Sequence, residues 1–436
     1  MISIPRKIAL LGGTATFGDC LTAVGMLLQG RLRGGPAISH FEAELASFIG
    51  VQHAFAFSAG RVALYALLKA LGIGSADEVL LQVPTHVVVP NAIRYAGASP
   101  VFVDCSLDNY NIDFADAERK ITSRTRALVL QHTFGIPADI DRALALASRY
   151  NLLLVEDCVH SLGSEYRGRR VGSFGHAAFF STEETKTISS TMGGVAVTND
   201  DQLAARLREF QNGCPWQPRS LVARYLLKFV LYWFLTEPHL HVLTRAVYES
   251  LGRRLPLPEP TSREEAFGKR PRIYQQRFSH AQAQLVRRQL RHIDCNLAHR
   301  RRVADAYAER LSAGGFRAAS IPAHGKAAML RYPVWVESRR NAVRDGRRHA
   351  VLGTWFTSVL EEAEALEVQG FIPGSCPRAE AATRHLVNLP IHSRVTEHDI
   401  ARIAAAILES SPGPEIEEQS THGETAVEQP LAEQQA

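Results

Sequence analysis

A carboxylate and an amine stand where they could act on one bound cofactor. Asp157 follows the apolar run 152–156, which is short and unalternated, as in a strand covered on both faces. Ligands of open α/β sheets lie outside the carboxyl ends of such strands, so this carboxylate is placed to meet one. Lys186 follows the next apolar run and stands in a loop, where a desolvated lysine can form a Schiff base. By itself the pair is weak evidence, and without further support a helix cap and a solvated lysine would be the better interpretation.

The cofactor that needs this pair is pyridoxal 5'-phosphate (PLP). It requires a lysine for its aldehyde and a carboxylate that keeps its pyridine nitrogen protonated. A phosphate site would complete it, and the turn of Ser58, Ala59, Gly60 and Arg61 has the right character. A predicted strand ends there and a helix begins, so free N–H groups and the helix dipole favour an anion. The alternative is a plain N-cap by Ser58.

The elements around these residues follow an α/β pattern. Between about Phe41 and Asp200, short apolar runs alternate with segments of helical periodicity, which predicts a mostly parallel sheet covered by helices. We expect strands at 53–57, 79–83, 101–104, 127–131, 152–156, 177–181 and 194–198. We expect helices at 41–49, 61–71, 87–96 and 139–150.

The rest of the chain divides by composition. We expect an N-terminal segment, a large cofactor-binding domain, an insertion rich in aromatic and basic residues, a smaller α+β C-terminal domain and a disordered acidic tail, at 1–34, 35–214, 215–275, 276–410 and 411–436. The C-terminal domain should contain a helix from Ser279 towards Leu311 and a strand over 328–336. A closing helix at 396–408 should begin with a capping box between Thr396 and Asp399.

Composition narrows the class of protein. The chain has 436 residues, 46% of them hydrophobic, and a formal net charge of +5. Its arginines are dispersed, which argues against nucleic-acid binding. Its six cysteines have no metal-binding or disulfide spacing, so we expect no metal and a cytoplasmic location. The apolar N-terminus is interrupted by Asp19 and resembles neither a signal peptide nor a membrane span.

The order of these motifs resembles the DegT-type sugar aminotransferases, which are PLP enzymes of the aspartate-aminotransferase-like fold (fold type I). The similarity covers about 35–211 and 277–408. It is carried by Phe41-Glu-Ala-Glu-Leu45, Ser58-Ala-Gly60, Pro100-Val-Phe-Val-Asp104, Glu156-Asp157, Val171-Gly-Ser-Phe-Gly175, Thr185-Lys186 and Leu389-Pro-Ile-His392.

The resemblance implies roles around the cofactor ring. Lys186 matches the lysine that binds PLP and moves the proton, and Asp157 matches the partner of the pyridine nitrogen. His86 falls where a ring stacks on the cofactor face. His160 stands where the family often has Gln beside the phenolic oxygen. For both histidines, a hydrogen-bonded core side chain is the alternative.

The resemblance also implies a phosphate cradle and a partner subunit. Ser181 and the turn from Ser58 to Arg61 match the cradle. Asn212 matches an asparagine that reaches the phosphate from the second subunit, which implies a homodimer with shared active sites.

The chain departs from the family at several positions. Arg61 replaces a threonine of the phosphate turn, and its guanidinium could hold phosphate bidentately. Glu183 and Glu184 replace an apolar residue and a proline. Met192 replaces an acidic residue, and Tyr274-Gln-Gln-Arg277 replaces a Gly-x-Asn-x-Arg segment that helps to bind sugar. PLP chemistry still fits, whereas the usual nucleotide-sugar substrate does not follow.

The insertion contains an apolar run, Tyr225 to Leu235, with arginines on both sides. Eleven residues are too short to cross a bilayer as a helix. They could lie in a membrane interface as a peripheral contact, or pack against the chain itself or a dimer partner.

The sequence leaves three candidate functions open. The first is a PLP-dependent aminotransferase that moves an amino group, from glutamate as the resemblance suggests, to a keto sugar linked to a nucleotide or a lipid. The second is a PLP-dependent sugar dehydratase, in whose relatives His replaces the lysine, so that Lys186 argues against it. The third is a non-catalytic or regulatory PLP-binding homologue.

Overall fold

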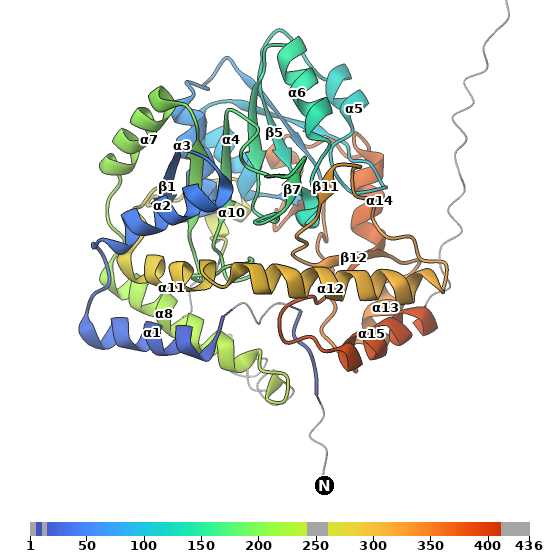
Figure 1. Cartoon of the computed structure of the whole chain (residues 1–436). Helices are drawn as coiled ribbons and strands as arrows, with labels where there is room; N and C mark the ends of the chain where they lie inside the picture. The colour runs from blue at the N-terminus through green and yellow to red at the C-terminus, as the bar shows by residue number, and fades with distance from the viewer. Residues whose placement is uncertain (1–5, 11–14, 242–259, 411–436) are drawn as a thin grey trace, which may run out of the picture.

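The computed structural model describes residues 6–10, 15–241 and 260–410. The tail predicted to be disordered lies outside these ranges. A seven-stranded sheet forms the centre of the molecule (Figure 1). Its order is β1 (His53–Phe57), β10 (Gly194–Thr198), β9 (Ala177–Ser181), β6 (Leu153–Asp157), β5 (Thr125–Gln131), β2 (Glu78–Gln82) and β4 (Ser99–Val103).

The prediction of a mostly parallel sheet is confirmed. The strands from β9 to β4 pair in parallel, and only β10 runs antiparallel to its neighbours β9 and β1. The strands predicted for this sheet all exist, with bounds that differ by at most two residues. The carboxyl ends of β6, β5 and β2 therefore open on one edge of the sheet, where a ligand of this architecture is expected.

Helices cover both faces of the sheet. Along β1, Phe55 and Phe57 join one buried cluster with α3, while Ala54 and Ala56 join another with α2 and α11. This alternation explains why the strand is apolar throughout. The covering helices are α2 (Ala37–Ile49), α3 (Gly60–Ala70), α4 (Val88–Ala96), α5 (Phe114–Arg119), α6 (Ile140–Arg149), α7 (Asp201–Gly213) and α11 (His280–Leu290).

The single helix predicted from Ser279 to Leu311 is wrong. The segment forms α11 and a second helix, α12 (Ile293–Ser312), separated where His292 leaves helical geometry. The two helices have different packing partners, since α11 lies against α2 and α1 while α12 lies against α15 (Glu397–Ser410). Helical periodicity continues across the break and hides it from the sequence.

The C-terminal domain is built around a two-stranded antiparallel ladder of β12 (Tyr332–Trp335) and β14 (Leu386–Leu389). The strand predicted at 328–336 is shorter than expected, because Ala328 and Leu330 donate their N–H groups to the loop at Phe134 and Gly135. The helices α12, α13 (Arg339–Gly346), α14 (Pro377–His385) and α15 surround the ladder. The predicted capping box is confirmed, with Thr396 N–H donating to Asp399 over 2.9 Å.

Several short elements complete the fold. The strand β13 (Leu360–Glu361) pairs in parallel with β3 (Thr85–His86), which brings a distant loop beside the large domain. The other short elements are β7 (Glu165–Tyr166), β8 (Arg169–Arg170), β11 (Gly325–Lys326), α10 (Arg263–Ala266) and the 3-10 turns at Thr133–Gly135 and Glu367–Gln369.

The apolar run of the insertion lies in α8 (Arg219–Leu235), which packs beside α1 (Phe17–Gln29) along one edge of the molecule (Figure 1). Leu226 and Phe229 are buried in a cluster with residues of α1 and α11. Trp233 Nε1 donates to the carbonyl of Ala15 over 3.1 Å. Part of the run therefore packs within its own chain. Of the helices in the described ranges, none is long and apolar enough to cross a membrane.

Two adjacent leucines of α8 test this packing. Leu226 is fully buried, whereas Leu227 is 49% exposed. Leu226→Ala should lower the free energy of unfolding by about 2 to 5 kcal/mol, because it removes buried methyl groups and leaves a cavity. Leu227→Ala should change it by about 0.5 kcal/mol or less. Urea denaturation of both variants checks this, and equal effects would contradict the assignment of the buried face.

Candidate active site

A cavity of about 270 Å³ lies at the carboxyl edge of the sheet, beside the N-terminus of α3. It is also bordered by Pro260 and Thr261 from the end of the insertion, and by Trp355 from the C-terminal part of the chain. Most of the residues singled out in the sequence line it, namely Ala59, Gly60, Arg61, His86, His160, Ser181 and Lys186. Segments distant in sequence thus meet around one hollow.

Asp157 is the last residue of β6 and is 1% exposed. Its Oδ1 accepts a hydrogen bond from the N–H of Val159 over 3.1 Å, while its Oδ2 has no partner in the described part of the chain. Burial raises the pKa of Asp157 to about 7, against the opposing effects of Val159 and Lys186. A buried carboxylate oxygen without a donor is suited to a protonated ring nitrogen.

Lys186 lies in the loop after β9, with its amine above the ring of Trp355 at 5.4 Å from the centroid. Burial lowers the pKa of Lys186 to about 8, although the carboxylates of Glu183 and Asp157 oppose the change. Such an amine has a larger neutral fraction near neutral pH than an ordinary lysine, and the neutral form can act as a nucleophile or base. Lys186 and Asp157 therefore have opposite, burial-driven shifts, a pattern found at functional sites.

The two histidines have different environments. His160 is 3% exposed, and its Nδ1 has no partner among the described residues, while its ring lies 4.7 Å from that of Trp355. Burial lowers the pKa of His160 well below its usual value, so the ring is neutral. His86 is held on both sides, since its Nδ1 accepts from Val88 N–H and its Nε2 lies 3.3 Å from Glu362. Both rings border the cavity.

The turn before α3 leaves backbone donors to an anion. The N-cap is Ala59, with no side-chain cap, so the cap by Ser58 considered as an alternative is absent. A Cβ on Gly60 would lie 3.2 Å from Ser181 Cβ and 3.4 Å from the carbonyl oxygen of Phe180. Glycine lets this helix terminus approach β9 closely, so that Ser181 and the first N–H groups of α3 border the cavity together.

The guanidinium of Arg61, which we expected to hold the phosphate, is bound by protein groups instead. Its Nε lies 2.7 Å from the buried carboxylate of Glu265, and its Nη1 donates to the carbonyl of Pro260 over 2.7 Å. The charged end therefore holds the last part of the insertion at the cavity. At the start of α3, Arg61 can still bind an anion through its backbone N–H group.

The two glutamates before Lys186 shape its loop. A carboxylate oxygen of Glu183 accepts hydrogen bonds from the N–H and hydroxyl of Thr185, over 3.0 and 2.5 Å. Glu184 lies 2.7 Å from the amine of Lys228 on α8. Burial raises the pKa of Glu184 to about 7, with Glu183 adding to the rise and Lys228 opposing it. This departure from the family pattern therefore ties the lysine loop to the inserted helix.

Asn212 lies outside this cavity. It is exposed at the end of α7, and its carbonyl oxygen accepts a hydrogen bond from the guanidinium of Arg277. Three residues that sequence reasoning missed do border the cavity: Arg331, Trp355 and Glu362. They come from segments with no motif of their own, and only the packing of the C-terminal domain brings them there.

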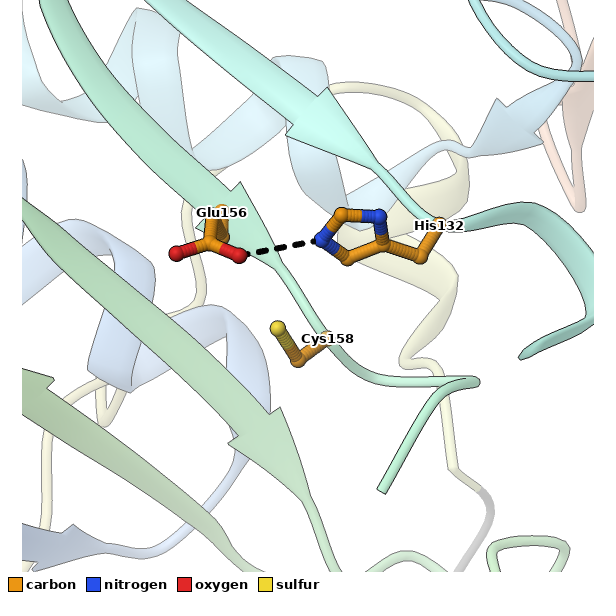
Figure 2. A group of neighbouring side chains, drawn as sticks. All are labelled: His132, Glu156 and Cys158. Atoms are coloured by element: carbon orange, nitrogen blue, oxygen red, sulfur yellow. Dashed lines mark hydrogen bonds and ion pairs between the residues drawn. The ribbon is translucent and has the colours of Figure 1, made fainter. Parts of the chain in front are cut away.

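A second cluster lies behind Asp157, where His132, Glu156 and Cys158 are all buried (Figure 2). Glu156 accepts hydrogen bonds from the N–H groups of Gly172, Phe174 and Gly175, and one of its oxygens lies 3.2 Å from His132 Nε2. His132 Nδ1 accepts from the N–H of Ala138, so Nε2 carries the proton and donates to Glu156. The ligand atoms of His132 and Glu156 are already occupied by hydrogen bonds, and the cluster stabilises the end of β6.

Comparison with known proteins identifies the family. The model of the DegT/DnrJ/EryC1/StrS aminotransferase family matches residues 19–221 and 259–408, which leaves most of α8 in the unmatched stretch between them. The chain is 31% identical over 390 residues to GDP-perosamine synthase of Caulobacter vibrioides, covering 86% of this chain and 90% of that protein. It is 29% identical over 410 residues to a UDP-N-acetyl-3-dehydro-alpha-D-glucosamine 3-aminotransferase of Acidithiobacillus ferrooxidans, covering 91% and 94%.

Comparison with solved structures leads to the same assignment. DesV of S. venezuelae, solved in complex with a ketimine intermediate, superposes with a TM-score of 0.71 at 28% identity, over 90% of this chain and 94% of that one. Helicobacter pylori PseC, at 21% identity and a TM-score of 0.72, covers 93% and 99% and supports the fold. The residues present also fit PLP, through the unpaired Oδ2 of Asp157, the buried amine of Lys186 and the narrow turn at Gly60. The chain is a PLP-dependent enzyme of fold type I and belongs to the DegT/DnrJ/EryC1/StrS aminotransferase family.

Proposed function

We propose that the enzyme transfers an amino group from glutamate to the keto group of a sugar linked to a nucleotide or a lipid. The observation that carries this proposal is the buried Lys186, whose amine borders a cavity with the unpaired carboxylate of Asp157 close by. The relatives named above, which make perosamine or aminate a dehydro-glucosamine, support a keto sugar as acceptor.

PLP supplies an aldehyde that condenses with amines and a ring that accepts electrons. Lys186 holds the cofactor, and its Nζ takes a proton from the substrate carbon and returns it. This suits an amine whose pKa burial lowers to about 8. Asp157 accepts a hydrogen bond from the ring nitrogen at Oδ2 and keeps that nitrogen protonated.

The remaining residues orient the cofactor. The N–H groups at the start of α3, after Ser58 and Ala59, hold the phosphate together with the hydroxyl of Ser181. His86, which is held by Glu362 and borders the cavity, would pack on a face of the cofactor ring. His160 donates a hydrogen bond to the phenolic oxygen, since its Nδ1 is free to do so.

Lys186 provides the direct test. Borohydride treatment should attach the cofactor covalently to the peptide that contains Lys186, and mass spectrometry would locate it. Lys186→Ala should bind PLP without the covalent link and should transfer no amino group from glutamate to any keto sugar, because Lys186 carries the only lysine amine among the described residues that border the cavity.

The matched control is Asp157→Asn, which should still be labelled at Lys186 but should lose most turnover, by several kcal/mol of activation free energy. Labelling at a different lysine would overturn the assignment. A labelled wild-type enzyme that is inactive with every keto sugar would favour the regulatory alternative, and loss of a sugar hydroxyl without amination would favour the dehydratase.

We also propose a homodimer in which Asn212 acts in the partner's site. Its exposed position outside the cavity of its own chain suits this role. Isologous dimers place the same residue of each subunit at the other's site.

Mixed dimers test the shared site. Lys186→Ala and Asn212→Ala chains should each be inactive alone. After denaturation and mixing they should recover roughly a quarter of the wild-type activity, because about half of the dimers are hybrids with one intact site. A fully active monomer in analytical ultracentrifugation, or hybrids that remain inactive, would contradict the proposal.

We further propose a cytoplasmic enzyme with peripheral membrane contact. All six cysteines are free, as suits a reducing compartment. The contact that the run 225–235 suggested shifts to α1, where Phe17, Leu21, Val24 and Leu28 form one apolar stripe, each 40–84% exposed.

Charge on the same edge favours an anionic lipid surface. Phe17, at the start of α1, lies 5.7 Å from Trp233 near the end of α8, so the two helices run antiparallel. Their opposite ends therefore lie together and carry four exposed arginines: Arg31, Arg33, Arg219 and Arg224. Burial of the stripe would contribute a few kcal/mol, and each arginine about 1 kcal/mol on anionic lipid.

Flotation with anionic vesicles tests this contact. Wild-type protein should float at low salt, and a variant with Phe17, Leu21 and Leu28 changed to Ser should not. The control is Ile372→Ser, which removes an apolar side chain that is 70% exposed elsewhere. If the wild type stays in the soluble fraction, the membrane contact is ruled out. Self-association that the stripe variant abolishes would assign the stripe to a second copy instead.

A further inference from the structure

Arg331 is a buried cation without an anion. It immediately precedes β12, is 5% exposed and borders the same cavity as Lys186. Its Nε has no hydrogen-bond partner, and its guanidinium forms no ion pair with any residue in the described ranges. The guanidinium instead lies over the ring of Trp355, whose centroid is 4.4 Å from Cζ.

Arg300, the other fully buried arginine in the described ranges, is satisfied by protein groups, in contrast to Arg331. Arg300, at 3% exposure, donates to Asn296 Oδ1 over 2.7 Å and to the carbonyl of Leu330 over 3.1 Å. Arg61 is paired with Glu265. Leaving a buried guanidinium unpaired costs several kcal/mol, which a protein tolerates where a ligand supplies the missing anion.

The charge persists at neutral pH. Burial lowers the pKa of Arg331 to about 10, and the carboxylates of Glu183 and Glu361 oppose the change without pairing with it. The cavity therefore offers a permanently cationic, planar group with several free donors. Such a group binds carboxylates bidentately.

The position of Arg331 relative to Lys186 selects the kind of anion. Both cations contact the ring of Trp355, at 4.4 and 5.4 Å from its centroid. An amino-acid donor carries its α-carboxylate on the same carbon as the nitrogen that is exchanged. The phosphates of an activated sugar are separated from the keto carbon by the sugar ring. An anion site this close to the reacting amine therefore fits the α-carboxylate.

We propose that Arg331 binds the α-carboxylate of the amino donor, with Trp355 holding the guanidinium plane by stacking. The assignment rests on the proposed transamination and adds the residue that recognises the donor. Since the acceptor sugar has no carboxylate on its keto carbon, Arg331 should matter for the donor half of the reaction and not for the sugar half.

The test compares glutamate with 4-aminobutyrate, whose amine-bearing carbon lacks a carboxylate. In single turnovers of the PLP form, the wild type should react with glutamate far faster. Arg331→Gln should slow glutamate about 10- to 100-fold and leave 4-aminobutyrate nearly unchanged, because only the hydrogen bonds to the carboxylate are lost. Arg331→Lys should fall between the two. The charge-loss control is Arg344→Gln on the surface of α13, which should behave as wild type.

A binding measurement separates this inference from the proposed function. The dissociation constant of maleate, an unreactive dicarboxylate, should rise about tenfold or more in Arg331→Gln, whether or not a sugar acceptor is known. Near-ultraviolet circular dichroism and the cofactor absorption band check that each variant is folded. If Arg331→Gln is not folded, the same binding measurement is made on Arg331→Lys. Unchanged maleate binding would overturn the inference. It would also be overturned if Arg331→Gln weakened the binding of GDP or UDP but not that of maleate, because Arg331 would then bind a diphosphate.

Discussion

The arrangement of this active site depends on one buried carboxylate oxygen that the protein leaves unpaired. Glu156 and Asp157 are neighbours at the end of β6, and their side chains leave the strand on opposite faces. Glu156 is saturated by three N–H groups and His132; burial alone would raise its pKa, but these bonds lower it. Asp157 has a single N–H donor, so burial dominates and raises its pKa to about 7. One carboxylate stabilises the strand, and the other is kept for the cofactor.

The unmatched helix and the unusual lysine loop are parts of one adaptation. Most of α8 lies outside the family match, and the glutamates at 183 and 184 are departures from the family pattern. Lys228 of α8 pairs with Glu184, and Arg61, another departure, pairs with Glu265 near the end of the insertion. Two of the departures in the large domain, Glu184 and Arg61, therefore have partners in the inserted segment. A substitution at only one side of either pair would leave a charge buried without compensation.

Local patterns in the sequence predict the sheet, its covering helices, Asp157 and Lys186. Each of these depends on an apolar run of a few residues and on the residue types directly after that run. Long-range pairing decides the features that were missed. The break between α11 and α12 results from the different helices that they meet, and the engagement of Arg61 depends on Glu265, about 200 residues away. Arg331, Trp355 and Glu362 reach the cavity only after the C-terminal domain packs against the sheet, so no local spacing marks them.

The charges around Lys186 shift its pKa in opposite directions, and a bound donor would change the balance between these shifts. Burial lowers the pKa of Lys186 most; Arg331 adds to this decrease, while Glu183 and Asp157 resist it. When it is free, the amine therefore has a larger neutral fraction near neutral pH than an ordinary lysine, although most of it is still protonated. A carboxylate on Arg331 would cancel the field of that guanidinium at Nζ, so the pKa of Lys186 would rise when the donor is in place. A neutral amine with a higher pKa is a stronger base, and proton removal from the donor carbon requires one. Through Arg331, recognition of the donor and the basicity of Lys186 would thus depend on the same contact.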